Sequence, residues 1–487
     1  MKLVEHFSVF RKGIIGIDHF YDTSPSGGEV LYADWTASGR LYRPIEDYII
    51  NELGPYVANT HTETTLTGTT MTNAYHDAQQ IIKQHVNANQ DDVIITAGSG
   101  MTLVINKLQR MLGLRVPEKW RSRLDIQEHE KPLVLITHME HHSNQTTWQE
   151  CEVTLEIVHA NEQGLPDLDH MQQLLEQYKD RPLKIGSFTA CSNVTGIKIP
   201  IHQMAEIMHQ HNGLCFVDYA ASAPYVEINM HPENPAQKLD AIFISPHKFL
   251  GGPGSSGILI FDKHLYTCKT PDQPGGGTVS WTNPWGEHKF FDNIEAREDG
   301  GTPGFLQTIK AALAFKVKDA MGVSHIAQRE ETLVNILMDG LSSHPEIKIL
   351  AADQKERLCI VSFYVLGIHH NLIVRLLNDK FGIQTRGGCS CAGTYGHILL
   401  NVDQLTSSEI THKIDQGDLT DKPGWVRVSL HPTNTDEEAH YVVDAIKRVI
   451  DNAEEWSRDY DFQRCSGEFK PNRVFPALKS LNDFKPV

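Results

Sequence analysis

The chain has 487 residues, with 44 Lys and Arg against 61 Asp and Glu, so its formal net charge is −17. This length allows two to four domains, and 40% hydrophobic and 22% charged residues are typical of a globular protein with a sizeable core. The acidic balance and the lack of any Lys/Arg block argue against nucleic acid as a partner. No apolar run reaches the roughly 18 residues that a membrane span needs, so we expect no membrane partner.

The start of the chain and its cysteines indicate where the protein resides. The first residues, MKLVEHFSVFRKG, lack the apolar core of a secretory signal. The eight cysteines are scattered, and only Cys389 and Cys391 form a local pair. We therefore expect a cytoplasmic protein.

Short apolar runs alternate with helical patterns between residues 90 and 262. Such runs, rich in β-branched residues and bounded by turn formers, predict buried strands. Strands separated by helices predict a parallel sheet covered on both faces, which places ligands at the carboxyl ends of its strands. The predicted strands are DDVIIT (91–96), PLVLIT (132–137), LKIGSFT (183–189), GLCFVD (213–218), DAIFIS (240–245) and GILIF (257–261).

Glycine-rich stretches at 275–277 and 300–304 precede a change in pattern. A predicted helix over 305–319 leads into a second alternating region with strands near 357–364 and 425–430. We predict a large domain over residues 31–309 and a small C-terminal domain over 310–487 that carries a mobile cysteine loop and a tail. Residues 1–30 are expected to pack on the small domain.

The glycine turn after the first predicted strand is a candidate anion site. Residues 98–102, GSGMT, precede a helical face formed by the apolar residues 104, 108, 111 and 112. A helix N-terminus presents free N–H groups to a phosphate, although a plain strand-to-helix turn has the same pattern. Neither a P-loop nor GxGxxG is present.

Asp218 and Lys248 each follow a predicted strand, thirty residues apart. Pyridoxal phosphate (PLP) requires such a pair, because a carboxylate keeps its pyridine nitrogen protonated and a lysine forms the Schiff base. The alternative is an ion pair at the rim of the sheet.

His141 follows the strand PLVLIT, where an imidazole could lie flat against a cofactor ring or serve a structural role. His138 and His142 are four residues apart and would share a helix face, which leaves a metal site as an alternative. No third ligand is evident from the sequence, so we expect no metal.

Cys391 lies in RGGCSCAG close to Arg386, a setting that could expose a thiol and lower its pKa. In an extended segment Cys389 would point to the same face, so a disulfide or half of a metal site remains open. Arg427, in the strand-like WVRVSL, could bind a substrate carboxylate through a bidentate fork or form a structural salt bridge.

Taken in order, these motifs resemble the class V aminotransferase-fold family of PLP enzymes, and within it the cysteine desulfurases and selenocysteine lyases. The resemblance extends from YADWTASGR at residue 32 to LHPTNTDEE near 438. It implies an α/β protein of PLP-dependent transferase fold type I. A large domain with a mainly parallel seven-stranded sheet would precede a smaller α+β domain. The matching pieces are EHHSN (140–144), SNVTG (192–196), VDYAAS (217–222), SPHKFLGGPGSSG (245–257), GGGT (275–278), GGTP (300–303), RGGCSCAG (386–393) and RVSL (427–430).

The resemblance also implies roles for single residues. Lys248 would form the Schiff base with PLP, Asp218 would pair with the pyridine nitrogen, and His141 would stack on the ring. Asn193 would lie beside the cofactor hydroxyl and the substrate carboxylate. Thr278 would reach the phosphate from a second subunit, which implies a homodimer. The phosphate contacts within the subunit would come from Ser99, Gly100, Met101, Ser245 and His247.

The implied reaction converts L-cysteine to L-alanine, with a persulfide on Cys391 that a sulfur-acceptor protein could receive, while Arg427 orients the substrate. Three departures keep other readings open. Ala221 stands where desulfurases usually have glutamine, Cys389 stands where group II enzymes have histidine, and the stretch from Cys391 to Arg427 is unusually long. The alternatives are a class V aminotransferase, another PLP-dependent amino-acid lyase, or an enzyme similar to the molybdenum-cofactor sulfurases.

Overall fold

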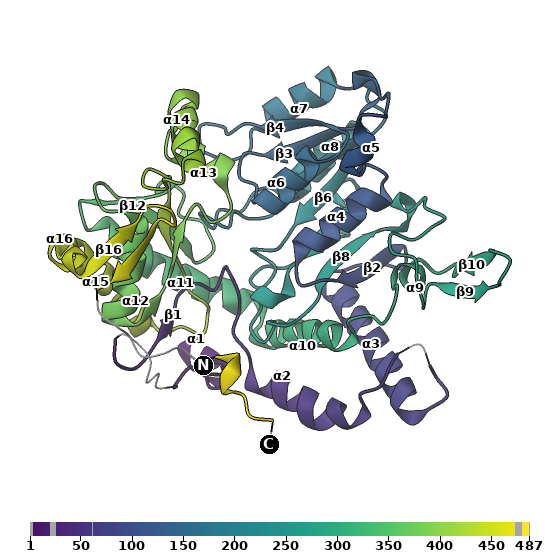
Figure 1. The fold of residues 1–487 in the computed structure, drawn as a ribbon, viewed down its shortest axis with the longest axis horizontal. Helices are drawn as coiled ribbons and strands as arrows, with labels where there is room; N and C mark the ends of the chain where they lie inside the picture. Colours follow the sequence, from purple (N-terminus) through teal and green to yellow (C-terminus); the bar gives the residue numbers. More distant parts are fainter. Residues whose placement is uncertain (1–2, 20–25, 61, 473–479, 487) are drawn as a thin grey trace.

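The computed structural model describes residues 3–19, 26–60, 62–472 and 480–486, and Figure 1 shows them arranged in two lobes. The larger lobe is built on a seven-stranded sheet, and the smaller lobe on a four-stranded sheet. No helix among these residues is long and apolar enough to span a bilayer.

The large sheet has the strand order β2-β8-β7-β6-β5-β3-β4. Neighbours from β7 to β4 pair in parallel, whereas β8 runs antiparallel to both β2 and β7. The mainly parallel seven-stranded sheet and all six predicted strands are confirmed. The strands are β2 (Asp92–Ala97), β3 (Leu133–Thr137), β4 (Thr154–Val158), β5 (Lys184–Thr189), β6 (Leu214–Asp218), β7 (Ala241–Ile244) and β8 (Gly257–Asp262).

Sequence reasoning missed β4, because this strand lies at the edge of the sheet. Four of its five residues are only partly buried, so it lacks the continuous apolar run of β3 or β7. An edge strand exposes part of its surface to solvent, and its composition is correspondingly more polar.

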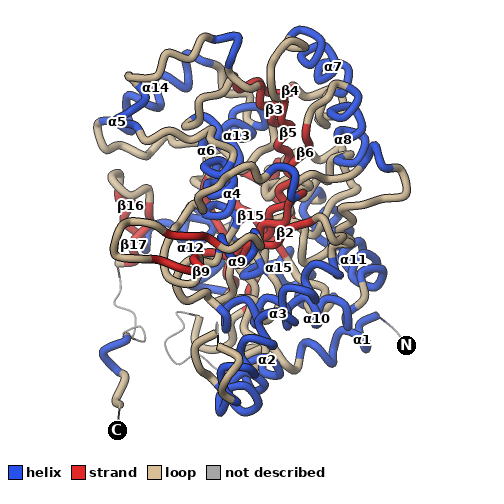
Figure 2. The backbone as a smooth tube through the Cα atoms, turned by 90° about the vertical axis from the view of Figure 1, so that its right-hand side faces the viewer, coloured by secondary structure: helices blue, strands red, loops and turns tan. Residues whose placement is uncertain are grey.

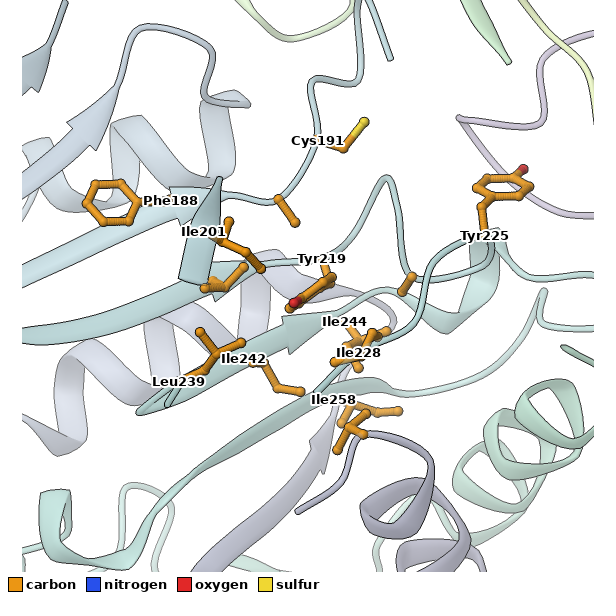
Figure 3. Close-up of a cluster of buried hydrophobic side chains, with 14 of the residues drawn as sticks. Phe188, Cys191, Ile201, Tyr219, Tyr225, Ile228, Leu239, Ile242, Ile244 and Ile258 are labelled. Atoms are coloured by element: carbon orange, nitrogen blue, oxygen red, sulfur yellow. The ribbon is translucent and has the colours of Figure 1, made fainter. Parts of the chain in front are cut away.

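Both faces of the sheet are buried against helices. In β7, Ala241 and Phe243 point into one core and Ile242 and Ile244 into the other, as the period of two in a strand requires. Figure 3 shows the second core, where Ile242 and Ile244 lie near Tyr219 and Ile258. Covering both faces explains why these strands are almost continuously apolar.

The helices form the two outer layers of the large lobe. Figure 2 shows α4 and α6 on one side of the strands and α7 and α8 on the other. On the same side of the sheet as α7 and α8, α10 packs against α3. The helix predicted over residues 305–319 corresponds to α10 and is confirmed. The bounds are α3 (Leu66–His85), α4 (Met101–Met111), α6 (His142–Gln149), α7 (Leu168–Gln177), α8 (Ile201–Gln210) and α10 (Phe305–Met321).

The small lobe has a hydrophobic core of its own around an antiparallel sheet of order β11-β12-β15-β14. Apart from Ala33, the buried residues of this core begin at Leu333 in α11. The boundary predicted at residue 310 lies inside α10, whose buried hydrophobic residues belong to the core of the large lobe. The elements are α11 (Val323–Ser342), β11 (Ile347–Ile349), β12 (Ile360–Val365), α12 (His370–Phe381), β14 (Arg386–Gly388), β15 (Trp425–Ser429) and α15 (Asp436–Asp451).

Smaller elements surround these two lobes. The helices α13 (Gly393–Leu399) and α14 (Gln404–Asp415) fill the long stretch between Cys391 and Arg427. Two hairpins lie farther out: β9 (Val279–Thr282) with β10 (His288–Phe290), and β16 (Tyr460–Gln463) with β17 (Glu468–Pro471). The second hairpin belongs to the C-terminal tail and packs its Phe462 and Phe469 rings against His369.

The N-terminal segment contacts both lobes. In α1 (Leu3–Arg11), the ring of His6 hydrogen-bonds the carbonyl of Met321 at the end of α10, and Arg11 forms a 2.8 Å salt bridge with Glu438 of α15. Farther along, β1 (Leu31–Tyr32) pairs in parallel with β13 (Ile383–Gln384). This separate two-stranded sheet attaches the beginning of the chain to the small lobe and positions the residues that follow β1.

The start of β8 lies directly against the glycine turn that opens α4. A Cβ on Gly257 would lie 2.4 Å from the carbonyl oxygen of Gly100, and this neighbour is backbone that cannot rotate away. We predict that Gly257→Ala lowers the free energy of unfolding by about 2–3 kcal/mol through this overpacking. Urea unfolding monitored by circular dichroism measures the change.

Gly276→Ala is the matched control, because its added Cβ meets nothing within 4 Å. Its stability should stay within about 0.5 kcal/mol of wild type. Equal effects of the two substitutions would show that the contact between Gly257 and Gly100 is not what constrains this turn.

Candidate active site

A cavity of about 1010 Å³ opens at the carboxyl ends of the parallel strands. This is the position that an open α/β sheet provides for a ligand. Both lobes contribute to its lining, which includes eleven of the twelve predicted site residues. They are Ser99, Gly100, Met101, His141, Asn193, Asp218, Ser245, His247, Lys248, Cys391 and Arg427.

Asp218 and Lys248 come from neighbouring strands. Asp218 is the last residue of β6, and Lys248 ends a single 3-10 turn just after β7, which pairs with β6. Burial raises the pKa of Asp218 to about 6, against the lowering effects of the Ala220 N–H and the Lys248 charge. Burial lowers the pKa of Lys248 to about 8, although the charge of Asp218 opposes this shift. The pair therefore offers an acid and an amine that both titrate near neutral pH.

His141 is the N-cap residue of α6. Its Nδ1 accepts a hydrogen bond from the backbone N–H of Ser143 at 3.1 Å, which places the ring proton on Nε2. Burial, followed by the charge of Lys248, lowers the pKa of His141 to about 3. The imidazole is therefore neutral and held in one orientation beside the cavity.

The predicted phosphate residues converge at the N-terminus of α4. The backbone N–H of Met101 donates to Ser245 Oγ at 2.9 Å. A Cβ on Gly100 would lie 3.3 Å from Ser245 Oγ and 3.7 Å from the ring of His247, so these side chains lie against the turn. Helix N-termini with adjacent donors favour anions.

Thr278 is the one predicted site residue outside the cavity lining. Its hydroxyl donates to the carbonyl of Gly275 at 2.7 Å and accepts from the N–H of the same residue, and its side chain is buried. A contact between Thr278 and the phosphate of a second subunit stays a prediction.

Arg427 lies in β15 and is only 3% exposed. Its Nη1 donates to the carbonyl of Asn193 at 3.0 Å, and its Nη2 donates to Asp34 Oδ1 at 2.8 Å. Its Nε is buried without a hydrogen-bond partner among the described residues. The expected bidentate fork is therefore partly engaged by a carboxylate of the protein itself.

Asn193 joins the large lobe to the cysteine loop. Its Nδ2 donates to the carbonyl of Ser390 at 2.7 Å. Its Oδ1 is buried in the cavity wall and has no partner in the described part of the chain. A buried acceptor without a donor costs free energy, so this atom indicates a ligand that donates a hydrogen bond.

The thiol of Cys391 is exposed on a loop with an unusual backbone. Ser390 and Cys391 adopt left-handed conformations, with φ of 49° and 57°. His142 holds the loop at two points: its N–H donates to the carbonyl of Cys391 at 2.8 Å, and its Nε2 accepts from Gly393 N–H at 2.9 Å. Cys389 is half-buried against the core of the large lobe. The loop thus presents one cysteine to the cavity and packs the other.

Sequence reasoning missed the roles of Asp34 and His142. The sequence offers His142 and His138 as a candidate metal pair. His138 instead precedes α6 and contacts the carbonyl of Gly164. Across the described residues, no group of three or more His, Cys, Asp or Glu side chains is arranged to hold a metal ion.

Asp34 lies in the YADWTASGR motif, but its partner Arg427 is 393 positions away, so no local pattern reveals the pair.

The sequence model of the family described as "Aminotransferase class-V" matches residues 31–442. The chain belongs to this family, whose members are PLP enzymes.

Two curated relatives support the family assignment. A probable cysteine desulfurase of Halalkalibacterium halodurans is 25% identical over 378 residues, which cover 76% of this chain and 86% of the relative. A cysteine desulfurase of Shigella flexneri is 30% identical over 322 residues, which cover 65% of this chain and 70% of the relative.

Solved structures have the same fold. The apo cysteine desulfurase of Thermococcus onnurineus matches with a TM-score of 0.72 at 21% identity, covering 91% of this chain and 98% of that one. The cysteine desulfurase CsdA of Escherichia coli matches with a TM-score of 0.70 at 20% identity, also covering 91% and 98%.

The residues present fit PLP. The orphaned Oδ1 of Asn193 is an acceptor suited to the cofactor hydroxyl, and the start of α4 suits the phosphate. Asp218 and Lys248 supply the buried acid and the amine on neighbouring strands. These contacts would leave Cys391 and Arg427 facing the part of the cavity that a substrate enters.

The depressed pKa of Lys248 makes its amine testable. With a pKa of about 8, about a quarter of the amine is neutral at pH 7.5, against about one in a thousand for an ordinary lysine. We predict that trinitrobenzenesulfonate modifies Lys248 of the cofactor-free protein with a midpoint near pH 8, measured by peptide mass spectrometry. Because only the deprotonated amine reacts, modification rises with pH, and a midpoint near 10 would contradict the burial of this amine.

Proposed function

We propose that this protein is a PLP-dependent cysteine desulfurase that converts L-cysteine to L-alanine and retains the sulfur as a persulfide on Cys391. One observation carries the proposal: the exposed thiol of Cys391 lines the same cavity as Lys248 and Asp218. The relatives named as cysteine desulfurases support it from the sequence side.

The residues that would hold PLP are those of the cavity floor. The α4 turn with Ser245 and His247 would bind its phosphate, Asp218 its pyridine nitrogen, Asn193 its hydroxyl and His141 the face of its ring. PLP held by these residues would supply an electron sink for the bonds to the α-carbon of an amino-acid substrate.

Two buried groups beside the cavity would handle protons and hydrogen bonds, and burial favours the neutral form of both. Lys248 Nζ, with a pKa of about 8, can accept a proton from the substrate and return it at the pH of a cell. His141 is neutral and carries its proton on Nε2, so it can donate a hydrogen bond from that nitrogen. Burial around both groups keeps water from competing for these protons.

The sulfur step is a displacement at the sulfur of the substrate. Cys391 Sγ, as the thiolate, forms an S–S bond while the Cβ–S bond of cysteine breaks. The electron pair of that bond stays with carbon, which takes up a proton and becomes the methyl group of alanine. No external oxidant is needed. Cys191 also lines the cavity, but burial raises its pKa and disfavours the thiolate, which leaves Cys391 as the nucleophile.

A persulfide on Cys391 would be accessible to an acceptor protein, because Cys391 itself is exposed. A homodimer would bring Thr278 of a second copy to the phosphate. All eight cysteines are free, which suits the reducing cytoplasm that we propose as the location.

Cys391→Ser tests the nucleophile. We predict that this variant loses at least 100-fold of the rate of alanine formation from L-cysteine, because a serine hydroxyl is a far weaker nucleophile toward sulfur. Cys389→Ser is the matched control two residues away and should keep most of the activity, since Cys389 packs against the core. Alanine and sulfide are quantified in parallel.

Equal activity of Cys391→Ser and wild type would refute the role of Cys391. Amino transfer from L-cysteine to a 2-oxo acid, without release of sulfur, would assign the protein to the aminotransferases instead.

A further inference from the structure

The start of α6 is anchored at the carboxyl edge of the large sheet. Glu140 is buried between the ends of β3 and β5, where its Oε1 accepts from the N–H of Thr137 at 3.2 Å and from the N–H of Thr189 at 3.0 Å. Asn144 is fully buried, and its Nδ2 donates to Glu140 Oε2 at 2.7 Å and to the carbonyl of Ser187 at 3.0 Å. A buried polar network with its partners in place is rigid. The first turn of α6 is therefore fixed relative to the floor of the cavity.

Another side of α6 faces the cysteine loop and α13, which Figures 1 and 2 both show beside it. His142 Nε2 accepts from the N–H of Gly393 at 2.9 Å, and Gln145 Oε1 accepts from the hydroxyl of Thr394 at 2.9 Å. The backbone N–H of His142 also donates to the carbonyl of Cys391 at 2.8 Å. Three hydrogen bonds thus join the first turn of α6 to the cysteine loop and the start of α13.

The loop that these bonds hold has an unfavourable backbone. Ser390 and Cys391 are both left-handed, which costs free energy for residues other than glycine. Such a conformation persists only where surrounding contacts enforce it. Asn193 supplies one such contact, at the carbonyl of Ser390, and His142 supplies the next ones along the chain. Without the acceptor of His142, we expect the loop to relax and the thiol to leave its position at the cavity.

His142 contacts the loop rather than the cavity. It is not among the described residues that line the cavity, whereas the adjacent His141 is. The two rings are 6.3 Å apart and tilted by 48°, because successive residues of a helix point in different directions. Burial, followed by the charge of Lys422, lowers the pKa of His142. The neutral imidazole keeps on Nε2 the lone pair that the N–H of Gly393 needs.

We infer that His142 is a positioning residue for sulfur transfer: through the N–H of Gly393 it holds the Cys391 thiol at the cavity. The inference rests on the proposed function, because it assigns the sulfur step to Cys391. One helix then positions both sides of the site, with His141 beside the cofactor and His142 beside the nucleophile. A reacting group displaced by about 1 Å can lose roughly 100-fold in rate. The effect of His142 therefore falls on the sulfur step and not on the binding of the amino acid.

The first test removes the acceptor and then restores it. His142→Leu fills similar space without an acceptor, whereas His142→Gln places an amide oxygen near the position of Nε2. We expect the single-turnover rate of alanine formation from L-cysteine to fall about 10- to 100-fold in His142→Leu, and by less than about threefold in His142→Gln. The affinity of the PLP-loaded protein for L-alanine, measured by calorimetry, should stay within about twofold of wild type in both variants.

Hydrogen exchange measures the loop without turnover. In the PLP-loaded protein without substrate, the peptide over residues 389–395 should exchange about tenfold faster in His142→Leu than in wild type or His142→Gln, because the N–H of Gly393 loses its acceptor. Gln149→Leu is the matched control, because Gln149 is exposed at the end of the same helix. It should change neither the exchange nor the rate.

Gly393→Ala disturbs the same contact from the side of the loop. Its added Cβ would lie 3.1 Å from His142 Nε2, so the imidazole and the loop must move apart. We expect a slower sulfur step and faster exchange, in the same direction as His142→Leu. This variant leaves α6 intact, so it tests the contact even where His142→Leu fails to fold, which circular dichroism reports.

Three results would overturn the inference: unchanged exchange of the loop in His142→Leu, a rate of alanine formation equal to wild type in that variant, or a loss in His142→Gln as large as in His142→Leu. A parallel loss of affinity for L-alanine would also overturn it, by placing the effect at the cofactor instead. Wild-type protein that forms no alanine from L-cysteine would reject the proposed function and the sulfur step with it. Faster exchange in His142→Leu would then still establish that His142 holds the loop.

Discussion

The burial of Asp218 and Lys248 at the ends of two adjacent strands is the constraint around which the molecule is built. Removing a carboxylate and an ammonium from water is costly, and each group offsets only part of that cost for the other. The apolar layers on both faces of the large sheet supply the stability that permits it. In return, the low-dielectric site shifts both pKa values toward neutrality, where proton transfer is efficient.

The site is completed only where three distant parts of the chain meet. The large sheet contributes Asp218 and Lys248, the small sheet contributes Arg427, and the segment after β1 contributes Asp34. The cysteine loop is held to the large lobe by His142 and Asn193. The hydrogen bonds from His142 and Asn193 therefore position Cys391 and also hold the two lobes together. A shift of the cysteine loop would change the position of one lobe relative to the other.

Much of this arrangement follows from local pattern. Six of the seven strands of the large sheet are short segments with apolar or β-branched residues between turn formers, and α10 shows a helical pattern, so the sequence pattern identifies them. Asp218 ends one of these strands, and Lys248 and His141 each follow another, so the carboxyl edge of a parallel sheet brings the three together. The sequence pattern did not predict the edge strand β4, because its polar, half-exposed residues resemble those of a loop.

The sequence by itself determined the class of the protein, the strands of its large sheet and the identity of the acid, the amine and the thiol. Each of these depends on residues that are neighbours in the chain. Only the tertiary structure decided that Asp34 engages both Arg427 and Arg386, that His142 holds the cysteine loop, and that Asn193 Oδ1 has no partner among the described residues. These contacts join residues hundreds of positions apart, and their geometry is set by how the two cores pack together, which no short-range periodicity encodes.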